Sequence, residues 1–460
     1  MAYSSIVKPE DYFNTVLYTG NGSTQSVTGV GFQPDWVWIK GRSVAAGSNL
    51  SDAVRGVNRQ LQTASSAAEE TLTTCVTAFD SNGFTLGSNG NVNTNSATFV
   101  AWNWLAGGTA PAITYVVKVV SDSGNKYRFD DFGTSAVTLD LQEGGTYTFD
   151  QSDSSNSGHP LRFYTASDKS GGEYTTGVTT TGTPGSSGAQ TVITVAASAP
   201  TLYYQCSNHA GMGGQANTNS TFGSSNFSGS IQSTVSANTT AGFSVVKYTG
   251  TGANATIGHG LGVVPKMIRV KAYEDAQQWA VQHSALGATK GIRINTTAAA
   301  YTSSTRWNNN EPTSSVFTVG TEAEVNTNTE DHIAYCLAEK KGYSKIGSYT
   351  GNGNADGTFV YTGFRPAWIL LKQSSASGAG WRMHDNKRGI SGNPEDETLY
   401  ASSTNAESTG RDVDFLSNGF NLRTDSGDGN SSSSTYIYMA FAENPFVAND
   451  SGTAVPVVAR

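Results

Sequence analysis

Charged residues are scarce in this chain of 460 residues: Asp, Glu, Lys and Arg make up 14% of it, against about 25% in an average soluble protein. Helix-rich folds and coiled coils, which carry many charged side chains, are therefore excluded. Basic residues are the scarcer sign, with 28 Lys and Arg against 36 Asp and Glu and a net charge of −8. This balance excludes a nucleic acid and an anionic membrane surface as partners.

Cysteines and long apolar runs are also few. The three cysteines, Cys75, Cys206 and Cys336, cannot form a disulfide framework, and no stretch approaches the roughly 18 apolar residues of a membrane span. Met1 to Ser5 lack the basic and apolar parts of a signal peptide, so we expect synthesis in the host cytoplasm. The 52 glycines are instead typical of an exposed β-protein with many turns. A protein of a virus particle that is released by lysis is made in the cytoplasm and then exposed outside the cell. We therefore expect this chain in the virion.

One pattern of alternating strands and glycine turns occurs three times along the chain. The copies begin at Phe13, Phe243 and Tyr343, and each continues into an apolar strand that follows a proline and ends in a lysine. These lysines are Lys40, Lys271 and Lys372. The first and third copies also contain Ser-Asn-Gly-Phe, a hairpin signal that the second copy lacks. Each copy therefore predicts a β-sandwich or jelly roll of about 100 residues.

A further stretch, about one domain long, separates the first and second copies. The predicted fold is all-β and multidomain, with three related β-sandwich or jelly-roll repeats and one inserted β-sandwich. The predicted boundaries are 1–107 for repeat 1 with an N-terminal docking segment, 112–216 for the insert, 217–240 for a linker rich in Ser, Asn, Thr and Gly, 241–340 for repeat 2, 341–447 for repeat 3 and 448–460 for a C-terminal tail. We expect the whole molecule to be elongated.

Four residues of the insert have the side chains of a blue-copper site. His159 precedes one predicted strand, Cys206 ends another, and His209 and Met212 follow on the next loop. A thiolate and two imidazoles form a trigonal ligand set that suits copper, and a thioether supplies a weak axial bond. The spacing lets the loop after Cys206 turn back on the sulfur while His159 arrives from a neighbouring strand.

The insert resembles the cupredoxin family of plastocyanin, amicyanin and their relatives. The resemblance rests on His159, followed by Tyr203-Tyr204-x-Cys206-x-x-His209-x-x-Met212, and covers about 100 residues. It implies a type 1 copper site at His159, Cys206, His209 and Met212, with copper as the only cofactor. The alternative is a cupredoxin sandwich in which these side chains pack as ordinary core residues without metal. Cys75 and Cys336 lie in apolar strands and are expected to be inert.

The repeats resemble domains of structural proteins from marine and cyanobacterial bacteriophages, often described as tail-fibre proteins. The resemblance rests on Phe-x-Pro-x-Trp-x-x-x-Lys at 32–40 and 364–372, Asp-x-x-Arg-Gly at 52–56 and 385–389, the Ser-Asn-Gly-Phe hairpins and Val-Ala-Trp-Asn-Trp at 100–104. It implies a non-enzymatic virion protein, exposed as a tail fibre or surface appendage in host attachment. A capsid decoration or cement protein is the close alternative.

Two enzymatic or redox functions are weighed against this structural one. A polysaccharide depolymerase needs paired carboxylates or a Ser-His-Asp arrangement, whereas Asp52-x-x-Arg55 and Asp385-x-x-Arg388 indicate turns with local ion pairs. A dedicated copper redox protein has no need of three large repeats. The chain is therefore predicted not to be an enzyme.

The predicted partners are other virion proteins, further copies of the chain and a host-surface glycan or receptor. Exposed sheet edges favour a homo-oligomer, for which a trimer is one possibility. Tryptophans with period two usually fill a sandwich interior, so Trp36, Trp38, Trp102 and Trp104 are assigned to the core of repeat 1. Loop aromatics that are left for stacking on a sugar ring are Tyr301, Trp307 and Trp381.

Overall fold

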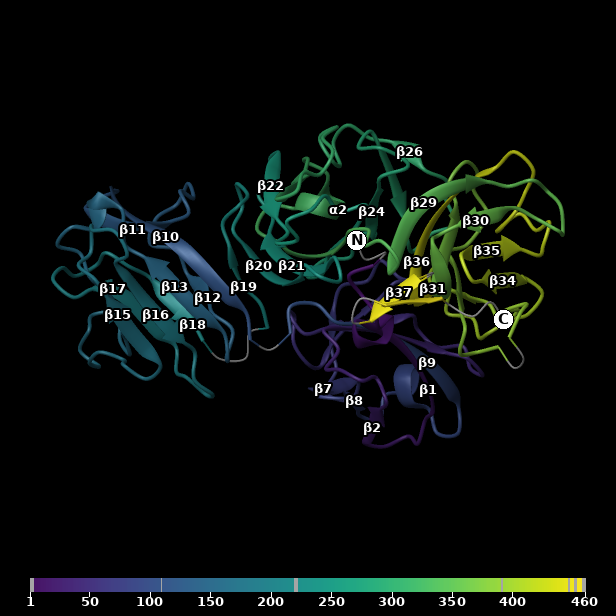
Figure 1. The fold of residues 1–460 in the computed structure, drawn as a ribbon, viewed down its shortest axis with the longest axis horizontal. Coiled ribbons are helices and arrows are strands. Elements are labelled where there is room, and N and C mark those ends of the chain that lie inside the picture. Colours follow the sequence, from purple (N-terminus) through teal and green to yellow (C-terminus); the bar gives the residue numbers. More distant parts are fainter. Residues whose placement is uncertain are drawn as a thin grey trace.

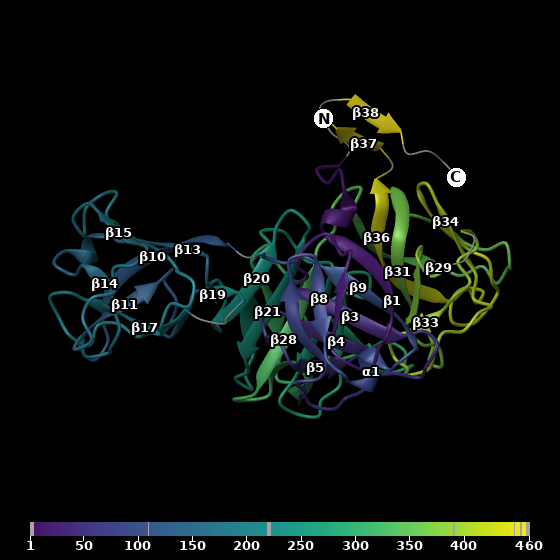
Figure 2. The ribbon, with the colours of Figure 1, turned by 90° about the horizontal axis from the view of Figure 1, so that it is seen from below.

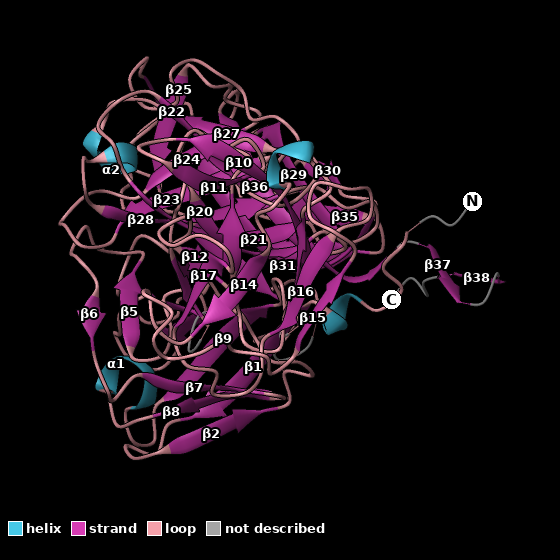
Figure 3. Ribbon diagram, turned by 90° about the vertical axis from the view of Figure 1, so that its left-hand side faces the viewer, coloured by secondary structure: helices cyan, strands magenta, loops and turns pink. Residues whose placement is uncertain are grey.

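The structure is a computed structural model that describes residues 4–108, 110–218, 222–389, 392–445, 447–450 and 453–456. Strands hold 42% of the chain and helices 3%, in several separate sheets, which confirms the predicted all-β, multidomain fold. Figure 3 shows how few helical turns accompany the strands. They are η1 (Pro9–Asp11), α1 (Gly90–Asn93), η2 (Ser154–Asn156) and α2 (Ala323–Asn326). None of the helices in the described ranges is long and apolar enough to cross a membrane.

Repeat 1 consists of a six-stranded sheet and a three-stranded sheet. The large sheet has the order β1 (Phe13–Thr19), β9 (Thr98–Trp104), β3 (Trp36–Gly41), β4 (Asn49–Asp52), β5 (Arg59–Gln62) and β6 (Glu70–Thr71). The small sheet has the order β2 (Gln25–Thr28), β8 (Gly83–Leu86) and β7 (Val76–Asp80). Asp80 pairs with Gly83, so Ser81 and Asn82 form the turn of the expected hairpin.

Repeat 2 has an eight-stranded sheet and a small sheet of only two strands. The large sheet has the order β19 (Ser224–Asn226), β20 (Ser233–Asn238), β21 (Phe243–Thr249), β28 (Asp331–Leu337), β23 (Met267–Ala272), β24 (Ala280–His283), β25 (Lys290–Arg293) and β26 (Tyr301–Thr302). The small sheet pairs β22 (Ala255–Gly258) with β27 (Val316–Val319). Its third strand is absent from the described residues of this repeat, which also lacks the Ser-Asn-Gly hairpin signal.

Repeat 3 has a five-stranded sheet and a three-stranded sheet. The large sheet has the order β29 (Ser344–Thr350), β36 (Thr435–Pro445), β31 (Phe364–Gln373), β32 (Arg382–Asp385) and β33 (Leu399–Tyr400). The small sheet has the order β30 (Phe359–Tyr361), β35 (Gly419–Leu422) and β34 (Val413–Leu416). A hairpin of β37 (Val447–Asp450) and β38 (Thr453–Pro456) follows, and Figure 2 shows it projecting from the rest of the molecule.

The three large sheets share one strand order. The equivalent strands are β1-β9-β3-β4-β5, β21-β28-β23-β24-β25 and β29-β36-β31-β32-β33. In each repeat the first strand therefore pairs with the last, and the strand after the proline pairs on the other side of that last strand. This order makes the three copies the same unit in topology as well as in sequence.

The insert is a separate sandwich at one end of the molecule, as Figure 1 shows. One sheet has the order β11 (Asn125–Phe129), β10 (Ala112–Ser121), β13 (Thr146–Asp150), β16 (Gln190–Thr194) and β15 (Val178–Thr181). The other has the order β12 (Leu139–Asp140), β18 (Gln215–Asn217), β17 (Leu202–Cys206) and β14 (Leu161–Tyr164). A hydrophobic cluster of its own fills the space between the two sheets.

The segment predicted as a linker, 217–240, is not a linker. It carries β19 and β20, which extend the large sheet of repeat 2. Phe227, between these strands, packs into the core of the insert and is 4% exposed. The polar composition indicated a linker, but Ser and Thr also occur in short strands that contain few apolar residues. Residues 219–221 of this segment lie outside the described residues.

The repeats surround one shared core instead of lying end to end, so the expected elongated arrangement is wrong for them. One cluster joins Trp36, Trp38, Trp102 and Trp104 of repeat 1 to aromatic residues of repeats 2 and 3. Trp36 stacks on Tyr335 with ring centroids 4.8 Å apart, and Trp104 meets Trp368 edge-on at 5.5 Å. The prediction that the four tryptophans are core residues is confirmed, but they fill the core between the repeats and not the interior of their own sandwich. That interior is a different cluster, which contains Val37 and Ile39.

Buried polar contacts join the repeats in a ring. Tyr335 of repeat 2 donates to the Asp52 carboxylate of repeat 1 at 2.7 Å. Trp102 of repeat 1 donates to the Asp385 carboxylate of repeat 3 at 2.9 Å. The third pair is His283 of repeat 2, whose Nε2 lies 3.3 Å from the Tyr438 carbonyl oxygen of repeat 3. The three repeats thus meet pairwise, as the subunits of a threefold assembly do.

Three equivalent lysines, each one residue before the end of the same strand in its repeat, form a second ring. Lys40 donates to the Ser403 carbonyl of repeat 3. Lys271 donates to the Ser66 carbonyl of repeat 1 at 3.1 Å, and Lys372 to the Thr297 carbonyl of repeat 2 at 3.2 Å. All three lysines are fully buried, and burial lowers the pKa to about 7 for Lys40 and to about 8 for Lys271 and Lys372.

Candidate metal centre

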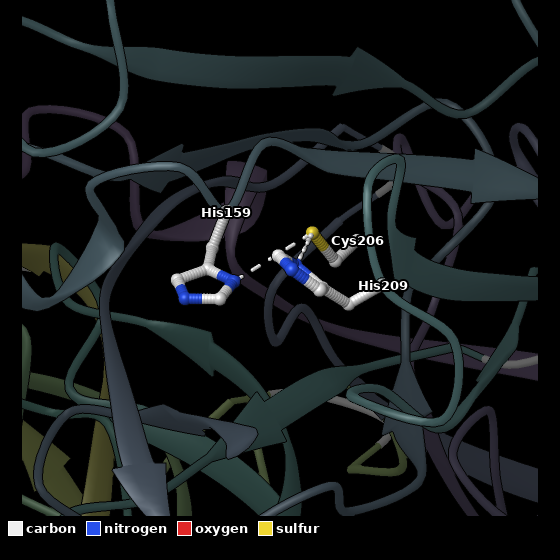
Figure 4. Close-up of side chains that lie close together, drawn as sticks. All are labelled: His159, Cys206 and His209. Carbon is white, nitrogen blue, oxygen red and sulfur yellow. Dashed lines mark hydrogen bonds between the residues drawn. The ribbon is translucent and has the colours of Figure 1, made fainter.

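Three of the four expected metal ligands meet at one end of the insert. Strands β14 and β17 are antiparallel, and Leu161 lies opposite Cys206. This register brings His159, two residues before Leu161, to the end of the sheet where Cys206 leaves it. The loop after Cys206 then returns His209 to the same point. Figure 4 shows His159 and His209 beside the sulfur of Cys206.

The distances from the sulfur to the two imidazoles fit one bound ion. Cys206 Sγ lies 3.8 Å from His159 Nδ1 and 3.6 Å from His209 Nδ1. Metal bonds of about 2.0–2.3 Å, at angles of about 110–120°, separate a sulfur from a nitrogen ligand by about 3.6–3.8 Å. All three ligand atoms lie within 4.8 Å of one another. The two sulfur–nitrogen distances therefore match those around a single bound copper ion.

The electrostatics at the site favour ligand-competent side chains. Cys206 is fully buried, His159 is half-buried and His209 is exposed, so the site is open to solvent on one side. Burial, and then the nearby His209 ring, lower the pKa of His159 below its usual range. The neutral imidazole, which is the form that binds a metal, is therefore favoured at neutral pH.

Hydrogen bonds to the backbone hold the ligands in place. The His159 carbonyl accepts from the Tyr127 hydroxyl at 2.8 Å and from the Gln151 amide at 2.9 Å. Lys169 donates to the carbonyls of Cys206 and Ser207, both at 3.2 Å. Such outer contacts orient ligands before a metal arrives.

Met212, the fourth expected ligand, follows His209 by three residues and is buried in the hydrophobic core of the insert. It is 1% exposed and packs in the same cluster as Cys206. Its carbonyl accepts from the Tyr127 backbone amide at 2.9 Å, which fixes the loop beside β11. Its thioether is soft and adaptable, the type that serves as a long axial ligand.

The two remaining thiols are buried, and the two Asp-x-x-Arg motifs form local ion pairs, as predicted. Cys75 and Cys336 are buried, and burial raises the pKa of both thiols. Asp52 accepts from Arg55 Nε, and Asp385 from Arg388 Nε, both at 2.6 Å. These aspartates are also the acceptors of the contacts between repeats, so they have structural partners on both sides.

The loop aromatics do not form an exposed sugar platform. Trp307 is 0% exposed and Trp381 is 1% exposed, so neither ring face is open to a ligand. Tyr301 is half-buried, and the Arg293 and Arg306 guanidinium groups lie 4.9 Å from its ring centroid. The expectation that these tryptophans stack on a receptor sugar is therefore wrong. Loop position indicated exposure, but neighbouring repeats cover Trp381 and the core of repeat 2 encloses Trp307.

Two features of the structure escaped the sequence analysis. The lysines of the buried ring stood in the repeat motif, but nothing in the pattern showed that they face a neighbouring repeat. Gln282, on β24, is 3% exposed, and both atoms of its side-chain amide are buried without a hydrogen-bond partner among the described residues. Its position in a short alternating strand gave no signal of this.

The fold and the site define an all-β, multidomain protein in which three related sandwiches share a core and a fourth carries a candidate metal centre. The chain belongs to the family described as Domain of unknown function (DUF7483), whose model matches residues 8–136 and 215–445. Residues 137–214, which contain all four candidate ligands, lie between the two matched ranges. No curated protein and no solved structure matches the chain.

Proposed function

We propose that this chain is a non-enzymatic structural protein of a bacteriophage particle, exposed on the virion as a tail fibre or surface appendage with a role in host attachment. The resemblance of its repeats to phage structural proteins supports the location. The single observation that supports a mechanical role is the shared core, in which tryptophans of all three repeats are buried together. Such a core makes three sandwiches into one rigid body, and rigidity suits a protein that bears load and presents loops.

A capsid decoration or cement protein is the second candidate, and one observation favours it. The contacts Tyr335 to Asp52, Trp102 to Asp385 and His283 to Tyr438 close a ring of three within a single chain. A body with this approximate threefold arrangement matches a threefold-related set of partner surfaces, such as those between capsid subunits. Homo-oligomerisation and contact with other virion proteins remain proposals under either function.

Electron microscopy of intact particles tests the location directly. An antibody against the purified chain, or a particle map in which the three-sandwich body is placed, is expected to put the protein at the tail. Density on the capsid facets would favour decoration over the fibre assignment. A protein that is absent from purified particles would overturn both structural proposals.

We further propose that the insert binds copper through His159, Cys206 and His209, with Met212 as the fourth ligand. The distances of 3.6 and 3.8 Å from Cys206 Sγ to the two imidazoles support this, as does the partial exposure that leaves an entry path. Copper would supply reversible one-electron chemistry at this site. His159, Cys206 and His209 would hold the ion, and the buried position of Cys206 shields that side of the site from water.

Titration of the purified full chain with Cu(II) tests the copper proposal. One equivalent is expected to produce an intense visible band from charge transfer between thiolate and copper. Cys206→Ser should abolish the band, whereas the matched control Cys336→Ser should keep it because that thiol is buried in repeat 2. A colourless sample with no bound metal by elemental analysis would show that the cluster is an ordinary core feature.

A further inference from the structure

The small sheet of repeat 3 carries two exposed aromatic side chains. Phe359 and Tyr361 are 45% and 57% exposed, and no other aromatic side chain in the described ranges is as exposed. Both lie on β30, an edge strand whose middle residue, Val360, is buried. Because side chains alternate along a strand, the two rings share the outer face of the sheet, with Cα atoms about 7 Å apart. Figure 1 shows this sheet at the end of the molecule that is remote from the insert.

A glycine on the neighbouring strand β35 lets the Phe359 ring lie on the sheet. Gly419 pairs with Tyr361, and a Cβ at Gly419 would lie 3.0 Å from the Cε2 and Cζ atoms of Phe359. The far end of the Phe359 ring therefore leans over the glycine, where a larger residue would crowd it. The ring is nevertheless about half open to solvent, so it presents a flat apolar surface at the level of the sheet.

Polar side chains continue the same outer face beside the aromatic pair. Strand pairing places Asn421 opposite Phe359, and Asp414 opposite Asn421. Arg423 Nε lies 3.0 Å from Asp414 Oδ2, and the Arg423 guanidinium also pairs with the exposed carboxylate of Asp356. The face therefore combines two apolar rings with an amide, two carboxylates and a guanidinium, which together donate and accept hydrogen bonds.

Repeat 1 has the same edge strand without the rings. Strand pairing aligns β2 of repeat 1 with β30 of repeat 3. Ser26 is then the equivalent of Phe359. Thr28 is the equivalent of Tyr361. Ser26 Oγ lies 3.1 Å from Thr85 Oγ1, so small hydroxyl side chains of repeat 1 pair with each other on this face.

Repeat 2 covers the equivalent strand with another segment. Thr256 and Gly258 of β22 hold the two positions, and the Ser230 amide donates to Thr256 Oγ1 at 3.0 Å. The segment before β20 therefore lies against this edge. Since two repeats form the same sheet without aromatic residues at these positions, the fold of the repeat does not require the exposed rings of repeat 3. Exposed apolar groups without a folding role indicate a binding surface.

The size of this face favours a sugar over a protein partner. A stable protein interface buries about 1,200–2,000 Å², and two rings flanked by charged side chains supply a much smaller apolar area. Strand β30 has three residues, which is too short to pair with an added strand of another protein.

The chemistry of the face also suits a sugar. A pyranose with equatorial hydroxyls carries axial C–H groups that form a flat apolar surface. These weakly positive hydrogens are attracted to the negative face of an aromatic ring. The hydroxyls at the rim of the sugar both donate and accept hydrogen bonds, as the neighbouring amide, carboxylates and guanidinium do.

We propose that Phe359 and Tyr361 bind a neutral chain of β-linked hexopyranose units by stacking on their rings. Asn421, Asp414 and Arg423 then serve the sugar hydroxyls. A neutral chain is favoured over an acidic one because the two carboxylates of the face outnumber its one guanidinium. This inference names a ligand class for the attachment role proposed above and rests on that role for its biological meaning.

Saturation-transfer NMR and calorimetric titration of the purified full chain with cellohexaose test the proposal. Cellohexaose is expected to bind saturably, and cellouronate, the same chain with a carboxylate on every unit, about threefold or more weakly. The double variant Phe359→Ser, Tyr361→Thr gives repeat 3 the side chains of repeat 1 and should weaken binding about tenfold or more. Tyr361→Phe keeps both rings and should bind within about threefold of the unmodified chain. Val116→Thr, at an exposed apolar residue of the insert, should leave binding unchanged.

Other outcomes would overturn the proposal. No binding of cellohexaose, or equal binding to the double variant, would reject the aromatic pair as a sugar site, and equal binding of cellouronate would reject the neutral class. Both positions are exposed, so the double variant should shift the melting midpoint by no more than about 1 °C; a larger fall would assign the rings a structural role. Self-association in sedimentation that the double variant removes would assign them to a second copy of the chain. Because these tests use purified protein, their outcome is independent of where the chain lies on the particle.

Discussion

Tyr335→Phe tests whether the three repeats are held together as one body. The substitution removes one hydroxyl from a fully buried ring and with it the 2.7 Å hydrogen bond to the Asp52 carboxylate of repeat 1. Asp52 keeps its bonds to Arg55, at 2.6 Å from Nε and 2.9 Å from the backbone amide, so the charge is not left unpaired. The expected loss is therefore that of a single hydrogen bond to a charged group, about 1.5–3 kcal/mol.

The loss should move the unfolding of the whole three-repeat body. With an unfolding entropy of about 2.1 cal/mol/K per residue over about 350 residues, it corresponds to a fall of about 2–4 °C in the melting midpoint. Differential scanning calorimetry measures this, and the insert, which has its own core, provides an unshifted reference transition. Tyr248→Phe is the matched control, since its hydroxyl donates at 2.6 Å to a neutral carbonyl within repeat 2 and should cost about 1 kcal/mol. An unchanged midpoint for Tyr335→Phe, or a shift confined to a separate transition of repeat 2, would refute the shared-body argument.

Three further predictions follow from buried groups. The pKa values of Lys40, Lys271 and Lys372 are lowered to between about 7 and 8, so above that range the unfolded chain binds more protons than the folded chain. Urea titrations should therefore show the free energy of unfolding rising from pH 7 towards pH 10, by up to about 1.4 kcal/mol per pH unit for each lysine. A flat profile would contradict this. Phe227→Ala should destabilise the insert by about 3–5 kcal/mol and move its calorimetric transition alone, although the residue lies outside the predicted insert. Asn93→Ala should lower the free energy of unfolding of repeat 1 by about 2–4 kcal/mol, measured by chemical denaturation, because the buried Asn93 amide donates to two loop carbonyls. A loss below about 1 kcal/mol would show that water replaces the amide.

Local signals were sufficient to predict the repeats. Period-two alternation and the Asn-Gly turns specify strands and hairpins between residues close in sequence, and β7–β8 and β34–β35 form as expected. The face of each strand was not predictable in the same way. Trp36, Val37, Trp38 and Ile39 are all apolar, so both faces of β3 are buried, and the sequence cannot say which face meets the small sheet. A continuous apolar run is the signal of a strand covered on both sides.

The candidate metal centre was predictable for a similar reason. Cys206 and His209 are three residues apart, and His159 lies at the end of the neighbouring strand, so a single strand pairing brings the ligands together. The contacts between the repeats join residues far apart in the sequence, such as Tyr335 and Asp52. No local pattern of residues records such a contact.

Three repeats in one chain permit an asymmetry that three identical subunits do not. Arg269 of repeat 2 occupies the position of Trp38 in repeat 1 and Leu370 in repeat 3, within the shared core. Its guanidinium carbon lies 5.4 and 5.2 Å from the ring centroids of Trp36 and Trp38, and burial lowers its pKa to about 9. In a homotrimer the same residue would bring three guanidinium groups into one aromatic core, where their mutual repulsion adds to the cost of burying each charge. Because the repeats differ, one cation rests on the tryptophans of another repeat.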